Sequence, residues 1–445
     1  MMKKTQRVLR QLRDHESRNV MFSEADGSWP IVWERARGVH VWDAEGKKYL
    51  DLTAAFGVAS AGHANPAVVR AGQRQMATLL HAMGDVHPHA QKALLARELS
   101  RITFGRWNQM YNAQVRYRLL PGEMPPHSQG KTIFCNSGFE AVEAALKTAQ
   151  LATHKPGVIA FHGAYHGLGY GTLNVTHREH FRSAFRDQLG AFGKFAPFPA
   201  HADDLPQLEK VLRNLFKKHL VGAILAEPVQ ARGGINIPPA DFLPLLRRLC
   251  DEHDALLILD EIYTGFGRTG AWFACEHSGV TPDLICLGKA LTGGFPLSAC
   301  VGRARVMDAA WPTSTGEAIH TSTFLGHPVG CAMALSQIAE IRRLKLVEAS
   351  ARLGKKLLSQ LGQLESKNWI LKARGIGLMA GIELRHRDGS SAGAGAMAII
   401  KAMLHRGFIL LPEGAHGNVI GFTPPLIITE AQLRAATSTL GEQLA

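Results

Sequence analysis

Three short polar segments of the sequence follow apolar runs and carry groups that could do chemistry. They are the segment Asn136-Ser137-Gly138, the carboxylate of Asp260 and the amine of Lys289. In open α/β sheets, ligands bind beyond the carboxyl ends of the strands. If the three apolar runs are strands of one sheet, these groups can form a single site.

Each segment has a functional and a purely structural interpretation. N–H groups after Ser137 could bind a phosphate, with Gly138 allowing its close approach; alternatively, Ser137 and Glu140 form a capping box. The carboxylate of Asp260 needs a cationic or donor partner, which could be a protonated ring nitrogen or the following loop. Lys289 lies among small residues, where its amine could attack a carbonyl, although most lysines are simply exposed.

The three groups together predict one particular cofactor. Pyridoxal phosphate needs an anchor for its phosphate, an acid for its ring nitrogen and a lysine for its aldehyde. A phosphate-binding turn, Asp260 and Lys289 supply all three. The combination therefore favours a pyridoxal-phosphate site over three unrelated structural features.

Charge and composition exclude several other classes of protein. The 445 residues include 50 Lys and Arg against 37 Asp and Glu, a net charge of +13 that would suit nucleic acid or an anionic small molecule. Basic residues are spread along the chain rather than gathered in blocks. The six cysteines lack the spacing of a metal site, so we expect no metal and a cytoplasmic location. The N-terminal segment lacks the apolar stretch of a secretory signal, and no apolar run approaches the ~20 residues of a membrane span.

The elements that position the three groups follow from an alternating pattern between residues 131 and 303. Apolar runs alternate there with helical segments such as 141–152 and 242–253, which is typical of an α/β fold with a mostly parallel central sheet. The expected strands are 132–135, 157–161, 222–226, 256–260, 284–287 and 298–301.

The flanking regions predict a second, smaller α+β domain. A turn signal at residues 43–46 separates two short runs, as in a hairpin, and further strands are expected at 378–384 and 417–422. Residues 104–130 form an irregular stretch that we cannot assign. The predicted division is an N-terminal segment of the small domain at 1–69, a large cofactor-binding domain at 70–334 and a C-terminal small domain at 335–445.

Motifs along the whole chain resemble the class III aminotransferases, pyridoxal-phosphate enzymes of fold type I that include acetylornithine, ornithine and 4-aminobutyrate aminotransferases. In order, the motifs are VWDAEGKKYLDL, Gly62-His63, NSGFEAVEAALK, FHGAYHG, AEPVQARGG, LDEIYTGFGRTG, PDLICLGKALTGG, HTSTFLGHP, ARGIGLMAGIEL and FTPPLIIT. The resemblance implies transfer of an amino group from an amino acid or ω-amine to a 2-oxo acid by a ping-pong mechanism.

The resemblance also implies roles for individual residues. Lys289 corresponds to the Schiff-base lysine and Asp260 to the partner of the pyridinium nitrogen. Thr323 corresponds to a threonine that reaches the cofactor phosphate of the neighbouring subunit, which implies a homodimer with shared active sites. The remaining expected contacts to the cofactor are Ser137, Gly138 and the N–H of Phe139 at the phosphate, Tyr165 and Ile262 on the ring faces, and His166, Glu227 and Tyr263.

Four positions depart from the family pattern. Phe139 stands where Ser, Thr or Ala is usual, and Tyr263 stands where many members have a Gln that contacts the cofactor's phenolic oxygen; the Tyr263 hydroxyl could substitute. Arg232 replaces a Glu, and Gly421 replaces an Arg that pairs with that Glu as a switch in ornithine and 4-aminobutyrate aminotransferases. We therefore hypothesise that Arg232 is a fixed anchor for a substrate carboxylate, the alternative being a surface arginine packed over its stem. Phe56 and Arg268 are further candidates for substrate contacts.

Two alternatives to transamination stay open from the sequence. An isomerase (an aminomutase or amino-acid racemase) or a decarboxylase of the same fold would keep Lys289 and Asp260, and the altered switch mildly favours an isomerase. A non-enzymatic basic binding protein would explain the charge, but not the lysine and aspartate together.

Overall fold

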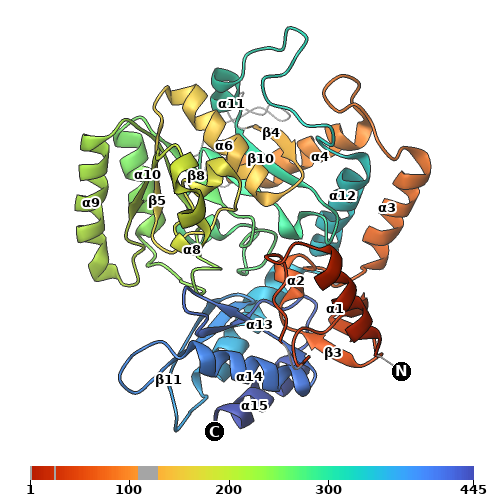
Figure 1. Cartoon of the computed structure of the whole chain (residues 1–445). Helices are drawn as coiled ribbons and strands as arrows, with labels where there is room; N and C mark the ends of the chain where they lie inside the picture. The colour runs from red at the N-terminus through yellow and green to blue at the C-terminus, as the bar shows by residue number, and fades with distance from the viewer. Residues whose placement is uncertain (1–2, 25–26, 109–128) are drawn as a thin grey trace.

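The computed structural model describes residues 3–24, 27–108 and 129–445. A seven-stranded sheet lies at the centre of the large domain, in the order β4-β10-β9-β8-β7-β5-β6 (Figure 1). Neighbouring strands among β9, β8, β7, β5 and β6 are parallel, whereas β10 is antiparallel to both of its neighbours, β4 and β9. The expected α/β fold with a mostly parallel sheet is confirmed. The strands are β4 (Gly130–Cys135), β5 (Gly157–Phe161), β6 (Gly193–Ala196), β7 (Val221–Ala226), β8 (Leu256–Asp260), β9 (Leu284–Leu287) and β10 (Ser298–Arg303).

Helices cover both faces of this sheet, which explains why its inner strands are continuous apolar runs. Every residue of β7 is buried. Ile224 packs in one apolar cluster with α10, and its neighbour Leu225 packs in a second cluster with α6. The helices and short helical turns of this domain are α6 (Gly138–Thr153), α7 (Tyr170–Leu173), α8 (Glu179–Arg182), η2 (Ser183–Gln188), η3 (Ala202–Asp204), α9 (Leu205–Lys218), α10 (Phe242–Glu252), η4 (Ala274–Ser278), η5 (Lys289–Leu291) and α11 (Ala304–Ala310).

The smaller α+β domain contains two four-stranded sheets, in the orders β1-β2-β3-β13 and β11-β12-β15-β14. Leu50 of β3 lies opposite Phe408 of β13 in a parallel pair, so the two ends of the chain share a sheet. The predicted hairpin at residues 43–46 joins β2 to β3. The strands are β1 (Trp33–Arg37), β2 (His40–Asp43), β3 (Lys48–Asp51), β11 (Ile370–Ile376), β12 (Met379–Arg385), β13 (Phe408–Ile409), β14 (Leu411–Glu413) and β15 (Val419–Phe422).

Long helices lie where the predicted domain boundaries fall. The boundary after residue 69 falls inside α3 (Pro66–Thr78) and the boundary after residue 334 falls inside α12 (Pro328–Arg343), and these two helices pack against each other. The other helices are α1 (Lys4–His15), α2 (Ala54–Gly57), α4 (Ala90–Ser100), the π-helical turn η1 (Arg101–Gly105), α13 (Leu346–Gly362), α14 (Gly393–His405) and α15 (Glu430–Leu444).

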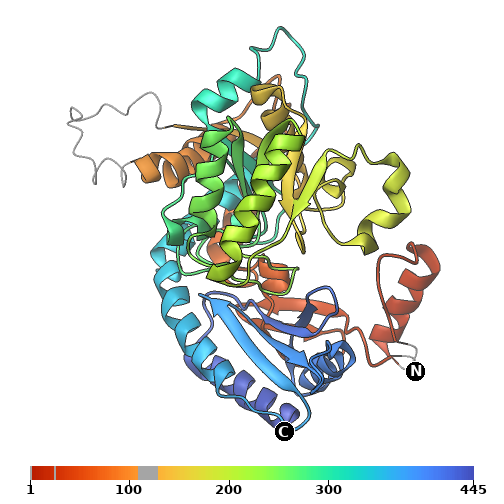
Figure 2. The same ribbon diagram turned by 90° about the vertical axis from the view of Figure 1, so that its left-hand side faces the viewer.

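Two regions at the periphery complete the description. Helix α1 buries none of its side chains and lies at the edge of the small domain (Figure 2), where Lys4 pairs with Glu34 of β1 at 3.0 Å and the N–H of Thr5 donates to Glu45 at 2.8 Å. Of the unassigned stretch 104–130, residues 109–128 lie outside the described part of the chain. Within the described residues, no helix has the length and apolar content needed to span a membrane.

Candidate active site

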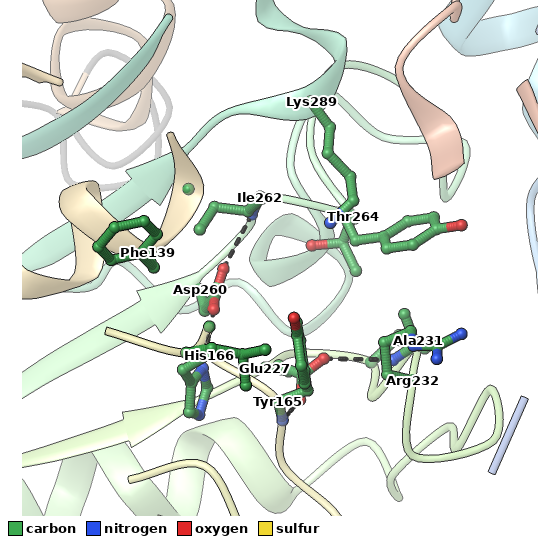
Figure 3. A pocket seen from close by; sticks show the side chains of 15 residues that line it. Phe139, Tyr165, His166, Glu227, Ala231, Arg232, Asp260, Ile262, Thr264 and Lys289 are labelled. Atoms are coloured by element: carbon green, nitrogen blue, oxygen red, sulfur yellow. Dashed lines mark hydrogen bonds and ion pairs between the residues drawn. The ribbon is translucent and has the colours of Figure 1, made fainter. Parts of the chain in front are cut away.

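A cavity of about 370 Å³ opens where the carboxyl ends of β5, β7, β8 and β9 meet the first turn of α6 (Figure 3). This volume lies within the range of roughly 300–1,000 Å³ that is usual for small-molecule sites. The cavity brings together residues from five separate parts of the sequence. The predicted site residues that line it are Gly138, Phe139, Tyr165, His166, Glu227, Arg232, Asp260, Ile262, Tyr263 and Lys289.

Lys289 enters the cavity from the turn η5, directly after β9 and Gly288. Its Nζ lies over the ring of Tyr263, 4.5 Å from the ring centroid. Burial lowers the pKa of Lys289, and the nearby carboxylates of Asp260 and Glu227 oppose this shift. A lysine in this environment releases its proton more readily than an exposed one, as an amine nucleophile must.

Asp260 ends β8 and holds its carboxylate in a fixed orientation. Its Oδ2 lies 2.8 Å from Nδ1 of the buried His166, and its Oδ1 accepts a hydrogen bond of 3.1 Å from the N–H of Ile262. The other ring nitrogen of His166, Nε2, is buried and has no hydrogen-bond partner among the described residues. The pair therefore presents an oriented carboxylate to the cavity.

The turn between β4 and α6 supplies donors for an anion. Ser137 and Glu140 form the capping box that the sequence offered as the structural interpretation, with the Ser137 N–H donating to Glu140 at 3.3 Å. The buried Oγ of Ser137 has no further hydrogen-bond partner in the described part of the chain. The N–H groups of Gly138 and Phe139 open the 16-residue helix α6, where the helix dipole favours negative charge. A Cβ at Gly138 would lie 3.1 Å from Ile262, so glycine keeps this turn uncrowded.

Glu227 forms part of the cavity wall immediately after β7. Its carboxylate accepts hydrogen bonds from the N–H groups of Tyr165 at 3.1 Å and Ala231 at 3.2 Å. Burial raises the pKa of Glu227 to about 7; the charge of His166 opposes the shift and that of Asp260 adds to it. Glu227 therefore changes its charge near neutral pH in the cofactor-free chain.

Arg232 pairs with a carboxylate that the sequence did not reveal. Its Nη1 lies 2.9 Å from Oε2 of Glu413, at the end of β14. Burial raises the pKa of Glu413 to about 7, an effect that Arg232 and Lys289 oppose. No local motif marks Glu413, because its strand has three residues and lies 181 positions from Arg232. Thr264 and Val229 also line the cavity and were not predicted.

Four of the predicted residues do not line this cavity. Ser137 lies in the adjoining turn, and Thr323 is exposed to solvent. Phe56 is 51% exposed and lies in a turn with a left-handed backbone, at a φ of +63°. Arg268 is fully buried, and its Nη1 donates to the carbonyls of Leu378 and Pro424. The guanidinium of Arg268 therefore joins the two domains instead of facing the cavity.

The hydroxyl of Tyr263 also has a partner other than the expected one. It lies 3.2 Å from Oγ1 of Thr423, in the small domain. The ring face of Tyr263, rather than its hydroxyl, is directed at Lys289. The expectation that this hydroxyl replaces a glutamine side chain at the cofactor gains no support from this geometry.

The residues of the cavity fit pyridoxal phosphate. The free N–H groups at the start of α6, with the Oγ of Ser137 beside them, suit the phosphate; the oriented carboxylate of Asp260 suits the ring nitrogen, and the Lys289 amine suits the aldehyde. Fold and site together define a pyridoxal-phosphate-dependent enzyme of fold type I.

The chain belongs to the class III aminotransferases, since the family model described as "Aminotransferase class-III" matches residues 21–444. The 5-aminovalerate aminotransferase DavT of Pseudomonas aeruginosa is 36% identical over 422 residues, 93% of each chain. The acetylornithine aminotransferase of Methanosarcina mazei is 33% identical, covering 96% of this chain and 94% of its own. A solved amine transaminase from an uncultivated Pseudomonas species, in its PLP-bound form, has a TM-score of 0.82 and 27% identity, over 97% of this chain and 98% of that one.

Family membership confirms the expected activity. The protein is a pyridoxal-phosphate-dependent aminotransferase that moves an amino group from an amine donor to an oxo acid. The isomerase, decarboxylase and basic-binding-protein alternatives are not favoured, because the relatives are named as aminotransferases.

Proposed function

We propose that the enzyme transfers the amino group of an ω-amino acid to a 2-oxo acid, with Lys289 as the residue that binds the cofactor covalently. The name of the Pseudomonas aeruginosa relative, a 5-aminovalerate aminotransferase, supports the donor class. Arg232 in the cavity wall supplies the positive charge that the acid group of such a donor needs.

Lys289 is the proposed nucleophile and base. Pyridoxal phosphate, when bound, supplies an electron sink for the pair released from the substrate's C–H bond. Burial lowers the pKa of Lys289, so its amine loses a proton more readily than an exposed lysine and would be able to bind the aldehyde carbon. With a substrate amine in the site, Nζ of Lys289 would accept the proton from the substrate carbon and hold it for delivery to the cofactor.

Asp260 and the turn at Ser137 are proposed to hold the cofactor in place. The carboxylate of Asp260, oriented by His166 and Ile262, stabilises a proton on the ring nitrogen. Ser137 Oγ and the first N–H groups of α6 bind the phosphate. Tyr165 and Ile262, which line the cavity, would contact the two faces of the ring.

The half-buried Lys289, in the same cavity as the Asp260–His166 pair, is the observation that carries the proposed role of this lysine. The test adds ω-amino acids, α-amino acids and simple amines one at a time to the yellow holoenzyme, without any oxo acid. Discharge of the colour by ω-amino acids, with release of the matching oxo product, is the expected result. Discharge by α-amino acids alone would refute the proposed donor class.

We also propose a homodimer, in which Thr323 contacts the cofactor phosphate of the neighbouring subunit. Thr323 is exposed and lies outside the cavity of its own chain. Large apolar side chains near it, Ile319 and Phe324, are 66% and 54% exposed, which is typical of an interface.

All six cysteines are buried free thiols, which fits the reducing cytoplasm that we propose as the location.

A further inference from the structure

The ion pair of Arg232 and Glu413 joins the cavity wall to the small domain. The Arg232 side chain keeps 31% of its exposure, whereas that of Glu413 keeps 5%. The N–H of Gly414 also donates to the carbonyl of Arg232 at 3.1 Å. The guanidinium therefore faces the cavity and the carboxylate lies behind it.

Glu413 fills space that Gly421 leaves open. Leu411 of β14 lies opposite Gly421 of β15. A Cβ at Gly421 would lie 3.0 Å from Cγ of Glu413, so a larger residue there would displace the glutamate.

The cluster around this ion pair is short of one negative charge. Arg178 brings a second guanidinium close to it, donating from Nη2 to the carbonyl of Ala415 at 3.4 Å. Burial lowers the pKa of Arg178, Arg232 lowers it further, and Glu413 opposes both effects. Of the three guanidinium nitrogens of Arg232, only Nη1 has a hydrogen-bond acceptor among the described residues, namely Glu413. Two guanidiniums thus share one carboxylate, and several N–H donors are free for a second.

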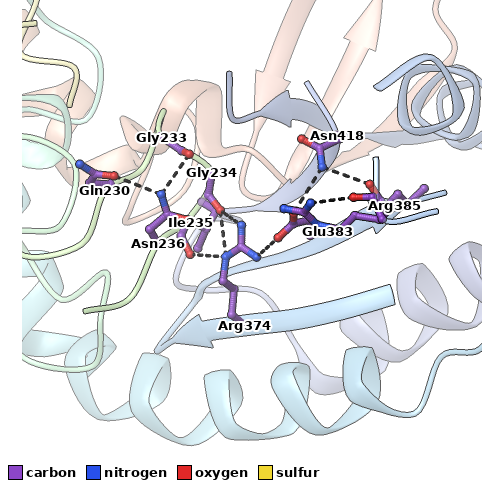
Figure 4. Close-up of polar contacts among 11 residues, drawn as sticks. Gln230, Gly233, Gly234, Ile235, Asn236, Arg374, Glu383, Arg385 and Asn418 are labelled. Carbon is purple, nitrogen blue, oxygen red and sulfur yellow. Dashed lines mark hydrogen bonds and ion pairs between the residues drawn. The ribbon is translucent and has the colours of Figure 1, made fainter. Parts of the chain in front are cut away.

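The loop that carries Arg232 is fixed on both sides (Figure 4). Gln230 and Asn236 exchange backbone hydrogen bonds of 3.1 and 2.9 Å across it. Arg374 of β11 donates from Nε to the carbonyls of Gly234 at 3.1 Å and Ile235 at 2.9 Å. A guanidinium on such a loop is held in place before any ligand arrives, which lowers the entropic cost of binding.

We propose that Arg232 and Arg178 form the binding site for an acid group of the substrate, and that Glu413 is the positioning residue that orients Arg232 toward it. This inference rests on the proposed function, because it identifies what selects the ω-amino acid. Figure 3 shows Arg232 on the opposite side of the cavity from Phe139, so this anion site is distinct from the phosphate turn.

Two donors that differ only in the acid group test the site. 5-Aminovalerate and pentylamine have the same chain length and amine, and only the first has a carboxylate. The measured quantity is the ratio of their rate constants for discharging the colour of the holoenzyme. We expect the wild type to prefer the acid by about 10- to 100-fold, the effect of a charged hydrogen bond.

Substitution of Arg232, which lines the cavity, should reduce this preference more than substitution of Arg178, which lies behind the wall beside Glu413. Arg232→Gln is expected to lose most of the preference, and Arg178→Gln about 3-fold of it. Arg213→Gln, which breaks an exposed ion-pair network on α9, is the matched control and should keep the wild-type ratio. An Arg232→Gln enzyme that keeps the preference would overturn the proposal.

Glu413 requires a separate pair of variants to show that it acts through position. Glu413→Gln keeps an oxygen that can accept the N–H of Arg232, so its ratio should equal or exceed that of the wild type. Glu413→Ala leaves Arg232 without this acceptor and should lose about 10-fold of the ratio. Equal losses in the two variants, or no loss in Glu413→Ala, would exclude a positioning role.

A binding measurement separates failure of this site from failure of the proposed donor class. Pentanoate has the acid group but no amine, so calorimetric titration of the holoenzyme with it reports the carboxylate site alone. We expect binding by the wild type and at least about 10-fold weaker binding by Arg232→Gln. If neither donor reacts but this difference holds, only the donor class is wrong. If the donors react equally and pentanoate binding is unaffected, the carboxylate site is wrong and transamination stands.

Discussion

At the scale of single residues, Asp260 offers the sharpest test of the cofactor site. Asp260→Asn keeps the shape and the hydrogen bond from Ile262 but removes the charge that favours a protonated ring nitrogen. We expect the cofactor to stay bound through gel filtration while kcat falls by about 10²- to 10³-fold, as for the loss of an oriented electrostatic contact. Lys289→Ala should be inactive. Full activity in either variant would contradict the assigned roles.

Glu227 should make stability depend on pH in the cofactor-free protein. Its pKa rises from an ordinary value of 4.5 to about 7 on burial, so the folded chain binds this proton more tightly than the unfolded chain. The stabilising effect is complete below pH 4.5 and is lost as the pH rises through about 7. Glu227→Gln removes the titrating group, so its free energy of unfolding should rise by about 3 kcal/mol relative to wild type between pH 4.5 and pH 8. A constant loss of about 1–2 kcal/mol is added to this trend, because glutamine has one acceptor oxygen for the N–H groups of Tyr165 and Ala231.

The measurement for Glu227 is the difference in melting temperature between wild type and variant as a function of pH. The melting temperature of the variant relative to wild type should rise steadily from pH 4.5 to pH 8. A difference that stays constant with pH would show that Glu227 does not titrate in this range.

Some residues of the cavity could be predicted from the sequence and others could not, for a physical reason. Asp260 and Lys289 follow directly on buried strands, so a local pattern places them at one edge of the sheet. The positions of Glu413 and Arg268 depend on contacts between distant segments. Glu413 reaches Arg232 from a three-residue strand. The guanidinium of Arg268 is held at the junction of the two domains by backbone carbonyls. The Gly-rich turn that contains Arg268 is visible in the sequence, but the direction of the Arg268 side chain is not.

At the scale of elements, the strands that sequence predicts best are those covered on both faces. β5, β7 and β9 are continuous apolar runs because every residue in them is buried. The edge strand β6 was not predicted, since only Ala196 of its four residues is buried. The strands β13 and β14 have only two and three residues, too few for a periodic pattern to identify them.

The contact between β11 and the Arg232 loop gives a prediction at this scale. Arg374 and Arg385 both pair with Glu383, but their side chains are 18% and 48% exposed (Figure 4). Arg374 also donates to the loop carbonyls, so Arg374→Ala should destabilise the fold by about 2–3 kcal/mol. Arg385→Ala, the matched control, should cost less than about 1 kcal/mol.

Thermal unfolding of the two variants, together with the preference for 5-aminovalerate over pentylamine, checks this prediction. Arg374→Ala should lower both the melting temperature and the preference, because the loop that holds Arg232 loses its support. Equal melting temperatures for Arg374→Ala and Arg385→Ala would show that the loop contacts add no stability.

At the scale of the whole molecule, the proposed dimer predicts that two inactive variants restore each other. Lys289→Ala lacks the covalent residue, and Thr323→Asp would place a carboxylate against the phosphate of the neighbouring subunit, where like charges repel. In a mixed dimer, one of the two sites combines an intact Lys289 from one chain with an intact Thr323 from its partner. Random mixing of equal amounts makes half of the dimers mixed, so about one quarter of wild-type activity should return.

Co-expression with two different affinity tags isolates the mixed dimer, whose activity should reach about half that of wild type. The control is each variant purified alone as a homodimer, which should be inactive. If Thr323 served the cavity of its own chain, each site of the mixed dimer would contain one defect and no activity would return. Recovery therefore requires that the active site is completed across the subunit interface, because no arrangement within single chains restores an intact site.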